Sequence, residues 1–172
     1  MQLVTNVTKY LEERRFSNNN LSAVVPVIFR NFAYMKEPRV YNGIERPEFT
    51  PERISELKAD EVFVFGSNLE GMHGGGAAWV AFLKFGAVLG CGVGLRGQSY
   101  AIPTMQGGVE TIKPYVDEFV AFAREHPELF FYVTRIGCGI AGFREKDIAP
   151  LFADAIGLAN VCLPEGFVKI LK

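Results

Sequence analysis

The chain is organised around residues 61–79, which read EVFVFGSNLEGMHGGGAAW. Val62 to Phe65 form a continuous apolar run of strand-favouring residues, which is typical of a strand buried on both faces of a sheet. At Gly66 this run stops, and a glycine-rich loop leads to Ala77, where helix-compatible residues resume. This order predicts a ligand loop at the carboxyl end of a central strand, where open α/β sheets bind their ligands. A tight structural turn is the alternative reading of the same glycines.

A second apolar run enters glycines in the same way. Residues 130–136 favour a strand, and Gly137-Cys138-Gly139-Ile140-Ala141-Gly142-Phe143 follow directly. Because the carboxyl ends of parallel strands meet at one edge of a sheet, we expect both loops to face one cleft. They could hold an elongated phosphorylated ligand between backbone amides, and helix N-termini would add positive partial charge.

Two nucleotide-binding motifs compete for these glycines. Residues 71–76 have the glycine spacing of a P-loop, but Ala77 and Ala78 stand where that motif requires Lys and a hydroxyl, which excludes a nucleotide triphosphatase. Gly137, Gly139 and Gly142 match the dinucleotide fingerprint. However, the helix does not open within that motif and no acidic residue follows at a later strand end, so a dinucleotide-binding site is disfavoured as well.

The composition is typical of a globular chain with a large apolar core and little net charge. Hydrophobic residues make up 49% of the 172 residues, and a net charge of −1 leaves no broad basic surface, so nucleic acid is an unlikely partner. Three cysteines at unrelated spacings argue against a disulfide framework, and no metal-binding spacing or cofactor motif is present. No apolar run approaches the roughly 20 residues of a membrane span, so the sequence predicts a cytoplasmic protein without a membrane partner.

The sequence divides into an N-terminal helical appendage with its linker, residues 1–45, and an α/β domain, residues 46–172. Within the appendage one apolar stripe has helical spacing and must be buried, either on the main domain or in a homo-oligomer formed through these helices. Its residues are Leu21, Val25, Ile28, Phe32 and Met35. Residues 37–50 contain Pro38, Gly43 and Pro47 and are predicted to be a turn-rich linker.

The α/β domain is predicted to alternate helices and strands. Thr50-Pro51-Glu52-Arg53 combines an N-cap residue, Pro at the first helical position and an early carboxylate, which predicts a short helix to about Lys58. Trp79 is expected to pack within a helix. The remaining expected elements are helices at 77–87, at 116–123 ending before Pro127, and at 147–158 capped by Asp147, with strands at 99–102 and 130–136 and a short apolar run at 161–163.

Residues 55–76 resemble the macrodomain pattern of a short helix, an Asp, an apolar strand, an Asn-containing turn and a glycine run, with Asp60 and Asn68 at the matching places. Residues 136–143 resemble the second phosphate-binding loop of that family. The sequence pattern most resembles that of a group of macrodomain-like proteins that includes phage proteins. The resemblance covers roughly residues 50–163 and implies a three-layer α/β/α domain with a mixed sheet.

The resemblance also implies a ligand, ADP-ribose or a related NAD-derived nucleotide. Residues 137–142 would wrap its diphosphate, residues 74–76 would flank the distal ribose, Asn68 would bind the ribose hydroxyls, and Phe143 would pack on that sugar. The chain has Phe49-Thr50-Pro51-Glu52 where the family holds adenine, and residues 77–79 lack the acid that family hydrolases often place there. Binding is therefore favoured, and a hydrolase acting on an ADP-ribosyl bond is the alternative.

Individual side chains in the two loops keep more than one interpretation. His73 could transfer protons or sit in a turn, Glu70 could act as a general base or be solvated, and Cys138 could be a low-pKa thiol or a small buried filler. Arg96 and Arg144 could each pair with phosphate or be a solvated surface residue. The predicted catalytic candidates are Asn68, Glu70 and His73, and the predicted ligand-binding residues are Gly66, Ser67, Asn68, Gly74, Gly75, Gly76, Gly137, Cys138, Gly139, Ile140, Ala141, Gly142 and Phe143.

Overall fold

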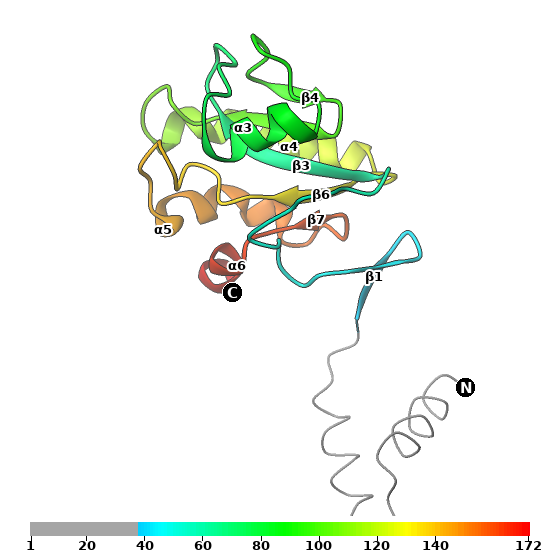
Figure 1. Ribbon diagram of the computed structural model, residues 1–172. Helices are drawn as coiled ribbons and strands as arrows, with labels where there is room; N and C mark the ends of the chain where they lie inside the picture. Colours follow the sequence, from blue (N-terminus) through cyan, green and yellow to red (C-terminus); the bar gives the residue numbers. More distant parts are fainter. Residues whose placement is uncertain (1–37) are drawn as a thin grey trace, which may run out of the picture. The chain divides into compact units, whose positions relative to one another are not determined.

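A computed structural model describes residues 38–172 of the chain, which divides into two units at residues 1–37 and 38–172 (Figure 1). The predicted helical stripe at 21–35 lies outside the described residues. The second unit opens with an antiparallel hairpin of β1 (Arg39–Tyr41) and β2 (Ile44–Arg46). Asn42 and Gly43 turn between them with φ values of 51° and 72°, the left-handed backbone that a two-residue hairpin loop requires. The segment predicted as a linker thus contains a hairpin.

The main sheet has five strands in the order β4-β5-β3-β6-β7. β3 pairs in parallel with β5 on one side and with β6 on the other, so the two apolar runs lie next to each other inside the sheet. Only β4 is antiparallel to its neighbour. The strands are β3 (Glu61–Ser67), β4 (Gly94–Arg96), β5 (Ser99–Pro103), β6 (Phe130–Val133) and β7 (Val161–Cys162).

Side chains alternate between the two faces of this sheet, as strand geometry requires. Val62 and Val64 join the larger core, which includes α4 (Val109–Glu125), the 3-10 helix η2 (Ala149–Ala155) and α6 (Glu165–Leu171). Phe63 and Phe65 pack instead against α3 (Gly76–Lys84). With α5 (Glu145–Ile148), the described residues form a mixed α/β domain of a five-stranded sheet and four helices, which confirms the predicted class.

The predicted helix at 50–58 is wrong, because these residues have no helical structure. The Thr50 backbone N–H donates to the Leu163 carbonyl at 2.9 Å, and the Thr50 hydroxyl donates to the Cys162 carbonyl at 2.7 Å. The hydroxyl that was expected to cap a helix is therefore engaged beside β7. Ile54 and Leu57 pack on the same face of the sheet as α3. Tertiary hydrogen bonds and burial override a local helix signal here.

One further expectation needs correction. The predicted helix at 147–158 is divided into α5 and η2, because Pro150 has no N–H to continue α-helical bonding; the N-cap is Arg144, and Asp147 lies in the first turn. Trp79 packs within α3, where its ring contacts that of Phe82 at 5.7 Å between centroids, and 45% of the residue is exposed.

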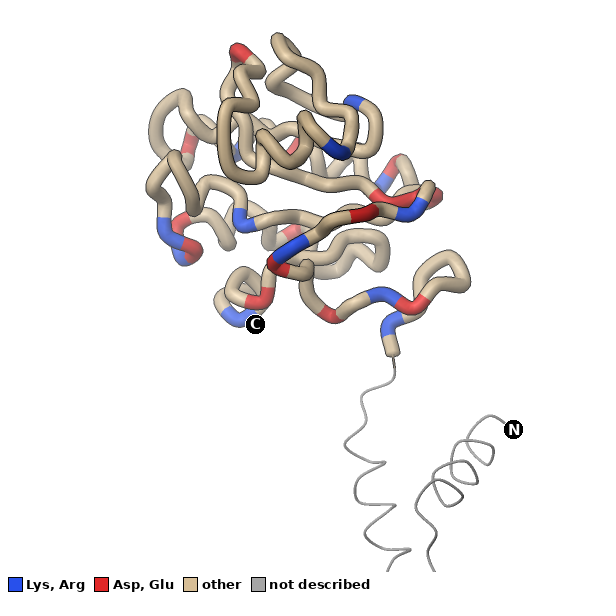
Figure 2. Tube along the Cα trace, in the orientation of Figure 1, with Lys and Arg blue, Asp and Glu red and all other residues tan. Residues whose placement is uncertain are grey.

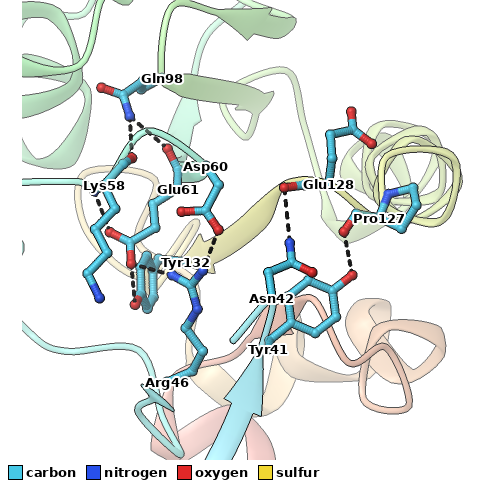
Figure 3. A network of polar contacts seen from close by, with 10 residues as sticks. All are labelled: Tyr41, Asn42, Arg46, Lys58, Asp60, Glu61, Gln98, Pro127, Glu128 and Tyr132. Carbon is cyan, nitrogen blue, oxygen red and sulfur yellow. Dashed lines mark hydrogen bonds and ion pairs between the residues drawn. The ribbon is translucent and has the colours of Figure 1, made fainter. Parts of the chain in front are cut away.

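A buried ion cluster at the amino end of β3 holds the hairpin on the sheet (Figure 3). The side chain of Arg46 is fully buried and pairs with Asp60 and with Glu61, the latter at 2.5 Å. The Tyr132 hydroxyl donates to the same Glu61 carboxylate at 3.2 Å. The Arg46 guanidinium also lies 4.4 Å from the ring centroid of Phe130, so the hairpin is attached through charge and through an aromatic face.

Two buried tyrosines should ionise at unusually high pH. Burial raises the pKa of Tyr100 and Tyr132 from 10.0 to about 12, and neighbouring carboxylates add to the rise. Since the folded pKa exceeds the unfolded value, the stability linked to the neutral phenols is complete below pH 10.0 and is lost as the pH rises towards about 12. In a tyrosinate absorbance titration, Tyr100→Phe and Tyr132→Phe should each remove one late transition. An unchanged late phase in either variant would contradict this assignment.

Candidate functional site

A cavity of about 180 Å³ lies where β3, β5 and β6 end at their carboxyl edges. Both glycine loops line it, together with the start of α3 and the turn that follows β5. This arrangement confirms that the two loops face one cleft. The lining residues are 66–68, 73–78, 104–105, 134–137 and 139–141.

The first wall of the cavity is the start of α3. Gly75 is the N-cap, and no side chain from the described residues caps the helix; the first helical bond runs from the Trp79 N–H to the Gly75 carbonyl at 3.2 Å. The N–H groups of Gly76, Ala77 and Ala78 therefore have no acceptor within residues 38–172. These residues line the cavity, and the helix dipole adds positive partial charge there.

The second wall is the loop after β6. Its Cys138, Gly142 and Phe143 N–H groups donate back to carbonyls of the same loop at 3.0 to 3.1 Å. The N–H groups between them, on residues 139–141, have no acceptor in the part of the chain that the structure describes. Since residues 139–141 line the cavity, amide donors without partners stand on both of its walls.

The two loops also approach each other across the cavity. Ile140 is 80% exposed, and a Cβ built on Gly75 would lie 3.4 Å from the Ile140 Cδ1 atom. The backbone of Gly75 is extended, at φ −168°, so any side chain there would be tolerated by the chain itself. The absence of a side chain at Gly75 keeps the space between the two glycine loops open.

The cavity carries almost no charge of its own. Glu70 is the single charged residue in 66–78 and residues 136–143 have none, as Figure 2 shows for the backbone trace. Arg135 lines the cavity, but its Nε atom pairs with Glu145 at 2.7 Å. Arg96 and Arg144 do not line it: Arg96 donates to the adjacent Leu95 carbonyl, and Arg144 pairs with Asp147. An anion here would be held by dipoles.

Among the catalytic candidates, Asn68 lies best for contact with a ligand. Its Oδ1 accepts the Met72 N–H at 3.0 Å, which leaves the side-chain NH₂ as a donor without an acceptor in residues 38–172. Glu70 is exposed and lies outside the lining, so its position does not support direct contact with a bound molecule. A catalytic role for either residue stays a prediction.

His73 lines the cavity but is packed inside the protein. The residue is 3% exposed, its Nε2 atom lies 3.0 Å from the Val88 carbonyl, and its ring stands edge-on to Phe65 at 5.3 Å. Its Nδ1 atom is buried with no hydrogen-bond partner among residues 38–172. This geometry does not support a role for His73 in proton transfer, because neither ring nitrogen is open to an attacking water in this conformation.

Three predicted ligand residues lie outside the cavity lining. Burial, followed by the charge of Glu145, raises the pKa of the Cys138 thiol, so the low-pKa alternative is wrong and the side chain packs beside the core. Phe143 packs against the core as well, and Gly142 is exposed. The expectation that Phe143 packs on a sugar within this cavity is not met, because its ring is used for folding.

Some lining residues were missed by sequence reasoning. Thr104 and Met105 follow β5, and Thr134 and Arg135 follow β6. Their common signal is their position directly after a strand, which is detectable once the strands are known to be parallel neighbours. The Thr104 hydroxyl donates to the Ser67 carbonyl at 3.3 Å and the Thr134 hydroxyl to the Val64 carbonyl at 2.9 Å, so Thr104 is bonded to the end of β3 and Thr134 to its middle.

A larger groove of about 1020 Å³ adjoins the cavity. It shares the lining residues Ala77, Thr134, Arg135 and Gly139 with the cavity, so the two spaces lie side by side. Its far wall is the extended segment 49–55, which takes the place of the predicted helix. The groove also reaches the amino end of α6 through residues 164–166.

The site offers backbone donors and few other chemical groups. No three His, Cys, Asp or Glu side chains within the described range 38–172 are grouped to hold a metal ion. No helix in that same range is long and apolar enough to cross a membrane. Comparison of the chain with protein-family models, with curated proteins and with solved structures gives no match.

Proposed function

We propose that this chain binds ADP-ribose or a related NAD-derived nucleotide, with the diphosphate in the cavity between the two glycine loops. The observation that carries the proposal is the pair of facing walls with free amide donors, residues 76–78 and 139–141. Neutral backbone donors at a helix start hold phosphate oxygens without a cluster of cations. The three-layer macrodomain arrangement belongs to this proposal as well.

The size of the two spaces supports an elongated ligand. The cavity of about 180 Å³ is smaller than the roughly 300–1,000 Å³ of most ligand pockets, so a whole nucleotide does not fit inside it. The adjoining groove of about 1020 Å³ has room for a nucleoside. A ligand that crosses the shared residues would place its diphosphate in the cavity and its base beside Phe49 and Glu52.

Recognition without turnover is the better-supported version of this function. Glu70 lies outside the cavity lining, the ring of His73 is packed, and residues 77–79 provide no acid after the glycine run. A hydrolase needs a base within about 3 Å of its attacking water. Asn68 can orient a hydroxyl or a water, but it cannot take a proton.

Calorimetric titration with ADP-ribose, AMP, NAD and cyclic ADP-ribose tests the proposal directly. We expect ADP-ribose to bind and AMP to bind much more weakly, because AMP has no diphosphate to place between the two walls. Equal affinity for AMP and ADP-ribose would remove the role of the cavity. Absence of binding by all four would overturn the proposed function.

Asn68→Ala should weaken ADP-ribose binding by about 1–3 kcal/mol, since one polar contact of the ligand is left unpaired. The control is Lys113→Ala, which removes an exposed side chain on α4 that pairs with Asp117. Wild type should show no turnover of an ADP-ribosylated substrate above background. Clear turnover that Asn68→Ala, Glu70→Ala and His73→Ala all leave unchanged would place the chemistry elsewhere.

A further inference from the structure

The loop between α3 and β4, residues 86–93, contributes no residue to the cavity lining. It nevertheless holds the first glycine loop at several points. The Ser67 hydroxyl donates to the Gly92 carbonyl, the His73 Nε2 atom lies 3.0 Å from the Val88 carbonyl, and the Gly90 N–H donates to the Gly71 carbonyl at 3.1 Å. Ser67 and His73 stand at the two ends of the segment that contains Asn68.

The 86–93 loop and the first glycine loop are in direct backbone contact at two glycines. A Cβ on Gly92 would lie 1.9 Å from the Asn68 carbonyl oxygen, a distance that no packed side chain can adopt. A Cβ on Gly71 would lie 2.4 Å from the Cys91 nitrogen, and Gly71 also has a left-handed φ of +62°. The loops are therefore interlocked, because neither glycine can take a side chain unless the backbone moves.

His73 holds the strained end of this arrangement. Its φ is 42°, in the left-handed region that residues other than glycine seldom adopt, and it directly precedes the glycine run 74–76. A carbonyl can only accept a hydrogen bond, so the Nε2 atom carries the hydrogen that Val88 receives. That bond and the edge contact with Phe65 keep the ring, and with it the turn into α3, in place.

We propose that the 86–93 loop, acting through His73 and Gly92, is the positioning element that preorganises Asn68 and the amides of residues 74–78 for the ligand. The proposal rests on the proposed function for the identity of that ligand. His73 is thereby a positioning residue that works through its Nε2 hydrogen bond. Preorganisation raises affinity because the loop has no ordering left to undergo on binding.

The test compares substitutions that separate the two ring nitrogens. The side-chain NH₂ of Gln in His73→Gln reaches about as far as Nε2 and can donate to Val88, whereas Asn in His73→Asn reaches only as far as Nδ1. Asn tolerates left-handed backbone better than Gln, so a defect confined to His73→Asn cannot come from backbone strain. Gly92→Ala disturbs the other contact. Gly157→Ala is the matched control, because nothing lies within 4 Å of its added Cβ.

Two readouts are measured on the full chain: ADP-ribose affinity, and hydrogen exchange of the amides of residues 68–78 without ligand. We expect His73→Asn and Gly92→Ala to bind at least about tenfold more weakly and to exchange at least about tenfold faster there, with His73→Gln closer to wild type and Gly157→Ala unchanged. Wild-type exchange in His73→Asn, or a greater defect in His73→Gln than in His73→Asn, would overturn the proposal. Failure of wild type to bind ADP-ribose would overturn the proposed function alone, because exchange still reports the positioning.

Discussion

Arg46→Ala should lower the free energy of unfolding by about 3–5 kcal/mol, because it removes the partner of two carboxylates in a buried cluster. The Arg46 side chain has no exposed surface, and that of Glu61 is 7% exposed. Glu61 would keep the Tyr132 hydroxyl and the Lys58 backbone N–H as donors but would lose its counter-charge. Denaturant unfolding, read as a shift of the midpoint at constant slope, measures the effect.

The matched control for this prediction is a solvent-exposed ion pair between a basic and an acidic side chain. Lys113→Ala breaks an i,i+4 pair with Asp117 whose side chains are about half exposed, and should change stability by about 0.5 kcal/mol or less. A combined Arg46→Met, Asp60→Leu and Glu61→Leu variant should be less destabilised than Arg46→Ala, since no charge is stranded. Equal, small effects in Arg46→Ala and Lys113→Ala would show that the cluster contributes no net stability.

Gly139→Val should abolish nucleotide binding, with a loss of about 100-fold or more, while the domain stays folded. No atom of residues 38–172 lies within 4 Å of a Cβ built on Gly139, and its φ is outside the left-handed region, so valine meets no obstacle in that part of the ligand-free protein. The new side chain would occupy the space beside the unpaired amides, where we place the diphosphate. Calorimetry with ADP-ribose and a thermal melt of the same sample measure the two effects.

Gly75→Val tests the facing wall in the same way. Its Cβ would lie 3.4 Å from the Ile140 Cδ1 atom, so the branched side chain fills the gap between the loops. Gly157→Val is the control, because Gly157 also has open space around its Cβ but does not line the cavity. If binding persists while thermal stability collapses in the Gly75 and Gly139 variants, these glycines are structural turns and the proposed site is wrong.

Much of the central fold follows from local sequence patterns. The apolar runs at 61–65 and 130–136 predicted buried strands, and β3 and β6 are buried and paired, although β6 ends at Val133. The run before Pro127 predicted α4, which ends at Glu125. Such runs can be read without a structure because a strand covered on both faces needs apolar side chains at every position.

The candidate site was predictable in its backbone and less so in its side chains. Strand carboxyl ends and glycine spacing located both loops, and the cavity joins them. Which side chains face that cavity depends on contacts made elsewhere: Phe143 and Cys138 pack towards the core, while Val88, distant from the glycines in sequence, holds His73. No spacing rule reports those contacts, because they join segments that are not neighbours in a regular element.

The sequence by itself determined the class of the domain, the two central strands, and the glycine loops that bring free amides to one edge of the sheet. These features depend on side-chain periodicity and on the backbone freedom of glycine, which are local properties. Only the tertiary structure decided that residues 50–58 are extended, that Arg46 is buried against Asp60 and Glu61, and that the 86–93 loop interlocks with residues 67–73. Each of these features depends on a hydrogen bond, an ion pair or a close backbone contact between segments that are distant in the sequence. Such tertiary contacts override the weak local preference of a segment for one secondary structure.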